Sequence, residues 1–439
     1  MLRSIFVIAL MIIGVYYALQ APFYALLSYL AYAYFRPEHW LWFNIIPPKF
    51  SFILGAYLAL RTLLSRPHFI INKPIIFLFV FVLHSFFSIL LSGYDKHHSW
   101  IAWTNFLNSI VVTYIMVILI TDFAKLRTAL LILALFLGVE GAKQGWVYLL
   151  TSPGSVNTNG IPFLGDNNGV AVGMLMLVPV IAFLAQTAQR RWIRFGFWFL
   201  LIGVLFRALS TYSRGGFLAC LAMGTAYWLR SRQKLRVLIG LLVVVAIVYP
   251  ALSDKYWARM DTISVDEEST ESSGRSRLHF WRVAVSMANA HPFLGVGSNS
   301  YIAAFNQYDF LNGQYGKNRA VHSAYFGVLG ETGYIGLVLY LLNLCYAVYN
   351  CSRVRKLAAR DPGMLALQQC ATALESSLIV FIVGSAFLTF QYAEMFWHYI
   401  GFTIVLERLA TQYALASTHP NEASPEVTMQ TVKTSTIPA

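Results

Sequence analysis

The chain has 439 residues, of which 58% are hydrophobic and only 12% are charged, and its mean hydropathy is +0.60. Soluble domains carry roughly 25% charged residues, so this composition excludes a water-soluble protein and indicates a membrane protein. The net charge of +13 would also fit nucleic-acid binding, but the basic residues form short clusters between apolar runs. Such clusters are typical of cytoplasmic loops, so we expect a lipid bilayer and no nucleic acid as a partner.

Apolar runs of nearly membrane-spanning length recur along most of the chain, and a helix needs about 20 residues to cross the hydrocarbon core. The runs are 2–18, 21–35, 50–65, 74–92, 103–121, 128–150, 167–188, 192–210, 213–229, 236–252, 330–350, 371–390 and 394–410. The first two share a very short connection and form either one irregular hairpin or two spans. We therefore expect an all-α polytopic fold with about twelve transmembrane helices (eleven to thirteen).

Basic clusters on alternate connections predict the orientation. They are Arg61, Arg66 and Lys73; Lys125 and Arg127; Arg190, Arg191 and Arg194; Arg230, Arg232, Lys234 and Arg236; and Arg353, Arg355, Lys356 and Arg360. Positive charge accumulates on the cytoplasmic side, so the segments between these clusters face outward.

Composition divides the chain into four parts. Residues 1–252 form an N-terminal transmembrane bundle, 253–321 an outer loop, 322–415 the C-terminal transmembrane helices, and 416–439 a Ser/Thr/Pro-rich tail. The tail is expected to be disordered and cytoplasmic. The loop is the one long polar stretch between spans and is too small to fold without help, so we expect it to contain short helices and to pack on the bundle.

The sequence Tyr212-Ser213-Arg214-Gly215-Gly216 stands where one span reaches the outer face and the next one returns. An Arg at this rim can snorkel to the lipid headgroups, or it can bind a phosphate. Because the glycines open the backbone around Arg214, we favour phosphate binding, with Tyr212 as a neighbouring substrate contact.

The outer loop supplies further cations. Arg275 and Arg277 precede Trp281, although an acidic run nearby can simply neutralise them; the run is Asp266, Glu267, Glu268 and Glu271. At the end of the loop, Lys317, Arg319 and His322 immediately precede a span.

His322 is the natural general base of this set, since an ordinary His titrates near neutral pH. A charged or polar group entering a span is costly unless it is solvated or functional. Glu331, nine residues further on, can orient His322 or cap the helix.

Three other groups of polar residues, and the cysteines, also have structural interpretations. Asp166 and Asn168 open a span, where they either cap the helix or line a polar mouth. Glu140 and Lys143 are three residues apart and are expected to pair on one helical face. Glu375 and Glu407 are expected to be structural, and the four cysteines are expected to be free thiols.

Several common sites are missing from the sequence. It has no Gly-rich phosphate loop followed by Lys-Ser/Thr, no metal-ligand spacing and no paired aspartates of the DxD type. We therefore expect neither a metal nor a cofactor. Outward arginines near a pyrophosphate and one proton acceptor suffice to displace a lipid-pyrophosphate leaving group.

Four motifs together resemble the O-antigen ligase/polymerase superfamily. They are the 212–216 sequence, Gly274-Arg275-Ser276-Arg277 with Trp281, Gly295-Val296-Gly297-Ser298-Asn299, and the stretch from His322 through Glu331-Thr332-Gly333-Tyr334-Ile335-Gly336. The N-terminal half, including Phe35-Arg36-Pro37-Glu38-His39-Trp40, looks like the branch described as O-glycosylation ligases. The resemblance spans nearly the whole chain. One departure is Asn167, which stands where the family usually has Pro.

The resemblance implies a GT-C-like glycosyltransferase of the Gram-negative inner membrane with its site on a periplasmic loop. The donor would be a glycan on undecaprenyl pyrophosphate, and the acceptor would be lipid A–core oligosaccharide. Carried over by motif, Arg214 and Arg277 bind pyrophosphate, with Arg275 as the alternative to Arg277, and His322 is the base. Polymerases and protein O-glycosylation ligases use the same donor, and a transporter would share only the helix count.

Overall fold

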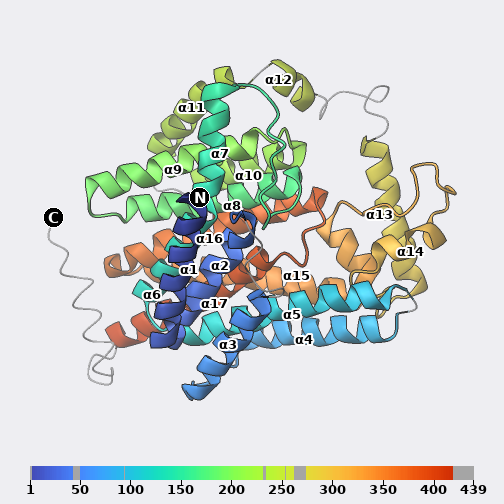
Figure 1. The fold of residues 1–439 in the computed structure, drawn as a ribbon, viewed down its shortest axis with the longest axis horizontal. Coiled ribbons are helices and arrows are strands. Elements are labelled where there is room, and N and C mark those ends of the chain that lie inside the picture. The colour runs from blue at the N-terminus through green and yellow to red at the C-terminus, as the bar shows by residue number, and fades with distance from the viewer. Residues whose placement is uncertain are drawn as a thin grey trace.

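The computed structural model describes residues 2–42, 50–92, 94–230, 234–252, 254–261 and 273–418. Within these ranges the chain is helical and contains no strand. The helices are α1 (Leu2–Gln20), α2 (Pro22–Phe35), η1 (Pro37–His39), α3 (Phe50–Leu64), α4 (Lys73–Leu90), α5 (Lys96–Leu119), α6 (Phe123–Phe136), α7 (Gly138–Thr151), α8 (Asn167–Gln186), α9 (Arg191–Leu209), α10 (Arg214–Arg230), α11 (Lys234–Ala251), α12 (Asp254–Asp261), α13 (Ser273–Ala290), α14 (Tyr301–Tyr308), α15 (Ala324–Ala358), η2 (Pro362–Met364), α16 (Leu365–Gly384), η3 (Ser385–Phe387) and α17 (Glu394–Thr418). The long helices form one bundle, and α13 and α14 gather at one end of it (Figure 1).

The described helices confirm an all-α membrane protein. Seven of them are long and apolar enough to cross a bilayer: Arg3–Gln20, Lys73–Leu90, Lys96–Leu119, Asn167–Gln186, Arg191–Leu209, Ala324–Ala358 and Pro362–Phe387. The first two apolar runs are separate helices, α1 and α2, joined at Ala21. A total of about twelve spans stays a prediction, because other apolar helices, such as α3 with 15 residues, are shorter than the roughly 20 residues a span needs.

The span predicted over 128–150 corresponds to two helices, α6 and α7, which meet at a kink at Leu137. Long hydrogen bonds mark the kink: Leu137 N donates to the Leu133 carbonyl at 3.2 Å, and Gly141 N donates to the Leu137 carbonyl at 3.3 Å. Small residues after the kink let α7 approach its neighbours closely. A Cβ atom on Gly145 would lie 1.9 Å from the Gly203 carbonyl oxygen on α9.

The end of the bundle that carries the predicted cytoplasmic clusters is joined by ion pairs. Glu375 of α16 is buried; Arg230 of α10 donates to its Oε1 at 2.9 Å, and Arg355 of α15 forms an ion pair with its Oε2 at 2.8 Å. Arg353 pairs with Glu407 of α17 at 2.6 Å. Two clusters that were predicted to share one side of the membrane therefore lie together, and both carboxylates have the structural role expected of them.

The outer loop docks on a break in α15. Gly333 adopts φ 71° and ψ −171° inside this helix, which takes the preceding carbonyl groups out of the helical ladder. Val296 N donates to the Gly330 carbonyl at 3.0 Å, and Gly297 N donates to the Glu331 carbonyl at 2.9 Å. Only a glycine fits at Gly295, where a Cβ would lie 2.3 Å from the Glu331 carbonyl carbon.

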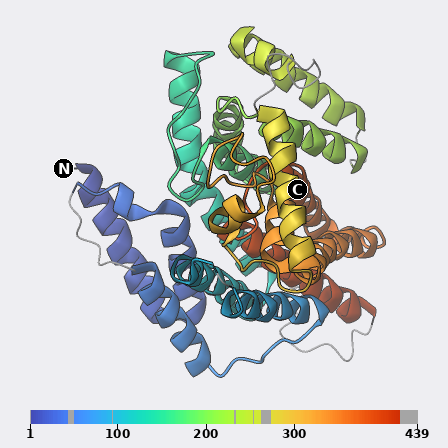
Figure 2. The same cartoon turned by 90° about the vertical axis from the view of Figure 1, so that its right-hand side faces the viewer.

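Aromatic stacking adds to this docking. Trp281 of α13 lies parallel to Phe326 of α15, with ring centroids 5.0 Å apart. Figure 2 shows α13 lying across the end of the bundle that faces the viewer. The described part of the loop therefore packs on the bundle, as its small size predicts. The predicted tail beyond residue 418 and the acidic run at 266–271 lie outside the described residues.

We predict that Gly145→Ala and Gly203→Ala each lower the melting temperature of the detergent-solubilised protein by several degrees. At both positions the new methyl group would overlap backbone or Trp146 atoms, and overpacking costs about 1–3 kcal/mol. Gly196→Ala on the same helix α9 is the matched control, because no atom lies within 4 Å of the added Cβ. Equal melting temperatures for all three variants would contradict the close α7–α9 contact.

Candidate functional site

The first turns of α8 and α10 are joined by hydrogen bonds. Ser213 Oγ donates to Asn168 Oδ1 at 2.8 Å and accepts from the Gly216 backbone N–H at 3.1 Å. The helices approach closely here, because a Cβ on Gly216 would lie 2.8 Å from the Ala171 Cβ. The side chain of Ser213 therefore fixes the start of α10 against the start of α8.

Tyr212, directly before Ser213 in the chain, stabilises this junction through contacts with other segments. Its backbone is left-handed, with φ 58°, and its hydroxyl donates to the Gly154 carbonyl. Its ring packs edge-on against the ring of Tyr256 of α12, with the ring centroids 4.9 Å apart. A buried aromatic in a left-handed conformation is costly unless its surroundings impose it. Tyr212 thus shapes the turn and does not line the cavity described next.

A polar cavity of about 80 Å³ lies at this junction, and arginines from both the bundle and the loop line it. Arg214 is the first residue of α10, and Arg277 comes from α13. The other lining residues are Asn168, Val172, Ser213, Gly215, Gly216, Gly384, Phe387 and Leu388. The first N–H groups of a helix favour an anion, and two guanidinium groups strengthen that preference. The cavity is suited to a phosphate-bearing ligand.

His322 is half-buried and lies close enough to Arg277 of the cavity wall for the two charges to interact. Its backbone is left-handed, with φ 49°, and its ring centroid lies 6.4 Å from that of Phe280 on α13. The Arg319 guanidinium lies 5.8 Å from the centroid of the same Phe280 ring.

The surroundings of His322 favour its neutral form. Burial lowers the pKa of the imidazole, the positive charges of Arg277 and Arg319 lower it further, and the carboxylate of Asp166 opposes them. The ordinary pKa of a His is near 6.5, so His322 is unprotonated at neutral pH. A neutral imidazole next to an anion site is able to accept a proton.

The other predicted residues divide into two groups. Asp166 caps α8 by accepting from the Gly169 N–H at 2.8 Å, and its charge acts on His322. Arg275 and Lys317 are exposed, and neither lines the cavity with Arg214 and Arg277. The structure therefore brings together Arg214, Arg277 and Asn168, with His322, Arg319 and Asp166 beside them.

The expectation that Glu331 orients His322 is wrong. Its carboxylate accepts instead from the Tyr301 backbone N–H at 3.4 Å, from the Tyr392 hydroxyl at 3.0 Å and from Gln391 Nε2 at 3.4 Å. Docking of the outer loop against the break in α15 brings Tyr301 to this carboxylate.

Sequence patterns gave no signal for a buried pair that braces the outer loop. His279 Nε2 and Asp309 Oδ1 lie 2.7 Å apart, and each side chain is 5% exposed. Although burial raises the pKa of Asp309, the backbone N–H groups of Leu311 and Gly313 and the His279 ring lower it below its ordinary value. This pair fixes the turn that leads to Arg319 and His322.

A second residue that the sequence analysis missed is Arg207, which is fully buried in α9. Its Nε donates to Gln144 Oε1 on α7 at 2.8 Å, and its Nη2 donates to the Asn159 carbonyl. Arg207 therefore ties α7 and α9 to the connection that carries Asp166 into α8. A lone Arg in an apolar run gives no indication of which carbonyl it will bind.

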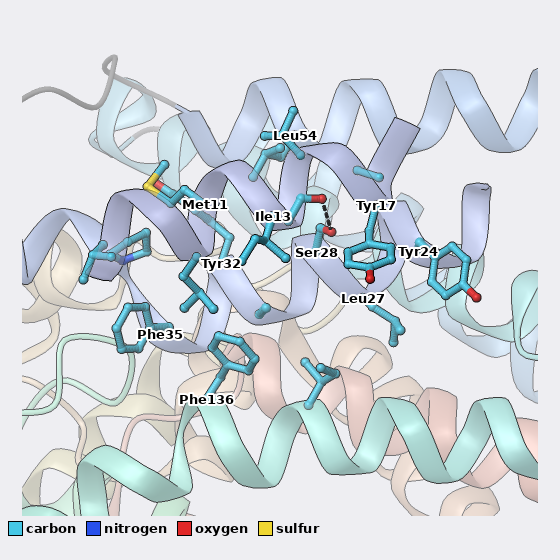
Figure 3. Close-up of a pocket in the computed structure, with 18 of the residues that line it drawn as sticks. Met11, Ile13, Tyr17, Tyr24, Leu27, Ser28, Tyr32, Phe35, Leu54 and Phe136 are labelled. Atoms are coloured by element: carbon cyan, nitrogen blue, oxygen red, sulfur yellow. Dashed lines mark hydrogen bonds between the residues drawn. The ribbon is translucent and has the colours of Figure 1, made fainter. Parts of the chain in front are cut away.

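A separate groove of about 300 Å³ lies between α1, α2, α3 and α6. Figure 3 shows Tyr32 and Phe35 of α2 and Phe136 of α6 around it. Ser28 also lines the groove, and its hydroxyl donates to the Gly14 carbonyl at 2.8 Å. The groove offers apolar surface and no acid–base chemistry.

These features define an all-α membrane protein with a cationic cavity where a polar loop meets the helix bundle. The family model described as O-antigen ligase matches residues 199–341, which include Arg214, Arg277 and His322. This match confirms the resemblance to the O-antigen ligase superfamily. A comparison with curated proteins found no match.

We predict that inorganic pyrophosphate raises the melting temperature of the wild-type protein, because a ligand that binds only the folded state stabilises it. In Arg214→Ala and in Arg277→Ala, the same rise in melting temperature should need an about tenfold higher pyrophosphate concentration, because a charged hydrogen bond to the ligand is lost. Arg275→Ala is the matched control, two residues from Arg277 and outside the cavity lining. Loss of the effect in Arg275→Ala with retention in Arg277→Ala would reverse the assignment.

Proposed function

We propose that this protein transfers a glycan from undecaprenyl pyrophosphate to lipid A–core oligosaccharide on the periplasmic face of a Gram-negative inner membrane. The observation that carries the proposal is the shared cavity of Arg214 and Arg277 at the start of α10, with neutral His322 beside it. The O-antigen ligase family match over 199–341 supports the same reaction class. A GT-C-like architecture is part of this proposal.

In the proposed reaction, a hydroxyl of the acceptor sugar attacks the anomeric carbon of the donor glycan. His322 accepts the hydroxyl proton as the new glycosidic bond forms. The bond between the anomeric carbon and the pyrophosphate oxygen breaks, and its electron pair leaves with undecaprenyl pyrophosphate. Attack from the side opposite the leaving group inverts the anomeric centre.

The arginines would act on the leaving group. Arg214 and Arg277 neutralise the charge that develops on the pyrophosphate, and the N-terminal N–H groups of α10 add to the same field. Arg319 is placed near His322 and adds positive charge to that side. In this account, Asn168 and Asp166 position the helix starts and the imidazole, while Lys317, Arg275 and Tyr212 lie outside the chemical centre.

Two rival reactions use the same donor, and the acceptor separates them. A polysaccharide polymerase would extend a second lipid-linked glycan, and a protein O-glycosylation ligase would modify a Ser or Thr of a pilin-like protein. We would reconstitute the protein with the donor and each acceptor separately. Transfer to lipid A–core alone supports the proposal, transfer to either of the other acceptors replaces it, and uptake without covalent transfer indicates a transporter.

We predict that His322→Ala lowers the rate of transfer about 10²–10⁴-fold, the usual contribution of a general base. His291→Ala is the matched control: this exposed His of the same loop contacts Tyr308 and lies apart from the cavity. Its rate should stay within about twofold of wild type. Wild-type transfer by a correctly inserted His322→Ala protein would refute the base assignment.

The acid side of the pH–rate profile provides a further prediction. The rate should fall as pH drops through the His322 pKa, which lies below 6.5, because the protonated ring cannot accept a proton. Removing the Arg277 charge in Arg277→Gln should raise the His322 pKa, so the acid limb of the residual activity should move to higher pH. In Arg275→Gln, the acid limb of the pH–rate profile should stay closer to its wild-type position. An acid limb that does not move in Arg277→Gln would contradict the proposed effect of Arg277 on the His322 pKa.

A further inference from the structure

A second polar cavity, of about 310 Å³, lies next to the segment that leads to His322. Ala320 and Val321 line it, and His322 follows them directly in the chain. The remaining lining residues are His98, Phe163, Asn299, Tyr301, Ile302, Glu331, Thr389, Phe390, Gln391, Tyr392 and Ala393. The cavity therefore adjoins the proposed base but shares no lining residue with the Arg214–Arg277 cavity.

The lining of this second cavity differs from that of the first: it contains one buried carboxyl group, Glu331, and none of its lining residues is an arginine or lysine. Glu331 is 4% exposed, and its hydrogen bonds come from a backbone N–H, a tyrosine hydroxyl and an amide. Among the described residues, no Lys or Arg forms an ion pair with it. Because the lining residues named above include no arginine or lysine to bind a phosphate, the pyrophosphate is not expected to enter here.

Within the described part of the chain, two buried polar atoms of residues that line this cavity have no hydrogen-bond partner. Gln391 is 2% exposed, and its Oε1 is unpaired while its Nε2 faces the Glu331 carboxylate. Asn299 Nδ2 is a second unpaired atom. Unsatisfied buried groups are rare in folded proteins, and an acceptor and a donor left open in one cavity indicate a ligand that can both donate and accept.

Hydroxyl groups match this requirement, because each can donate one hydrogen bond and accept others. The aromatic side chains of Phe163, Phe390 and Tyr392 supply apolar wall, and sites for small ligands combine such walls with a few placed polar groups. We propose that this cavity binds a neutral pyranose of the acceptor glycan, with Gln391, Asn299 and Glu331 as hydroxyl-recognising residues. The inference rests on the proposed function, and it places the acceptor and the pyrophosphate in two separate cavities.

The test is a kinetic comparison of Gln391→Leu with wild type, with acceptor and donor concentrations varied separately. Leucine preserves the volume of the side chain and removes both hydrogen-bonding atoms. We expect the KM for lipid A–core to rise about tenfold or more, with the donor KM unchanged. The matched control is Gln186→Leu, since this exposed Gln contacts Tyr227 outside both cavities.

A second variant covers the case in which Gln391→Leu fails to fold. Asn299 has φ 58°, so Asn299→Gly retains the backbone conformation while removing the unpaired donor. It should also raise the acceptor KM and leave the donor KM unchanged. A rise in donor KM alone, or an unchanged acceptor KM in both variants, would overturn the acceptor subsite while leaving the proposed function standing.

Binding without turnover separates the two proposals. Saturation-transfer NMR would use core oligosaccharide released from lipopolysaccharide, and the signal should weaken in Gln391→Leu or Asn299→Gly relative to Gln186→Leu. If wild type transfers no glycan, the proposed function fails, and this measurement still decides on the subsite. Equal binding by all of these proteins would overturn it.

Discussion

The hydrogen bond from Ser213 to Asn168 joins the starts of α10 and α8, and the position of the cationic cavity depends on it. Together with the close packing of Gly216 on Ala171, this contact fixes where Arg214 stands relative to α8. With it, the first turn of α10, the side-chain amide of Asn168 and Arg214 meet at one point. Arg277 then completes the cavity from a different part of the chain, so the cavity forms only when the outer loop is docked.

Docking of the loop depends in turn on the break in α15. In a continuous helix the carbonyl groups accept hydrogen bonds from N–H groups of the same helix. Because α15 is broken at Gly333, the carbonyls of Gly330 and Glu331 accept instead from the N–H groups of Val296 and Gly297. The same contact brings Tyr301 to the Glu331 carboxylate. These backbone hydrogen bonds thus help to position the outer loop, which contributes Arg277 to the first cavity and Asn299, Tyr301, Ala320 and Val321 to the second.

Much of this arrangement could be predicted from the sequence, because it depends on local patterns. Apolar length predicted the helices, and the shared sidedness of Arg214, Arg277 and His322 predicted a site where loop and bundle meet. The kink at Leu137, the burial of Arg207 and the His279–Asp309 pair could not be predicted, because each depends on a partner from a distant segment. Glu331 shows the same limit. Its position in the sequence suggested an interaction with His322, but in the fold its carboxylate accepts hydrogen bonds from Tyr392 and Gln391.

The central claim is that Arg214 and Arg277 hold one pyrophosphate beside His322. The most direct measurement is the position of that group in an experimental structure of the protein in lipid nanodiscs, with a non-transferable undecaprenyl-pyrophosphate glycan bound. This account predicts phosphate density against both guanidinium groups at the start of α10, with the first sugar toward His322. Density for the pyrophosphate elsewhere, or contact with only one of the two arginines, would contradict it.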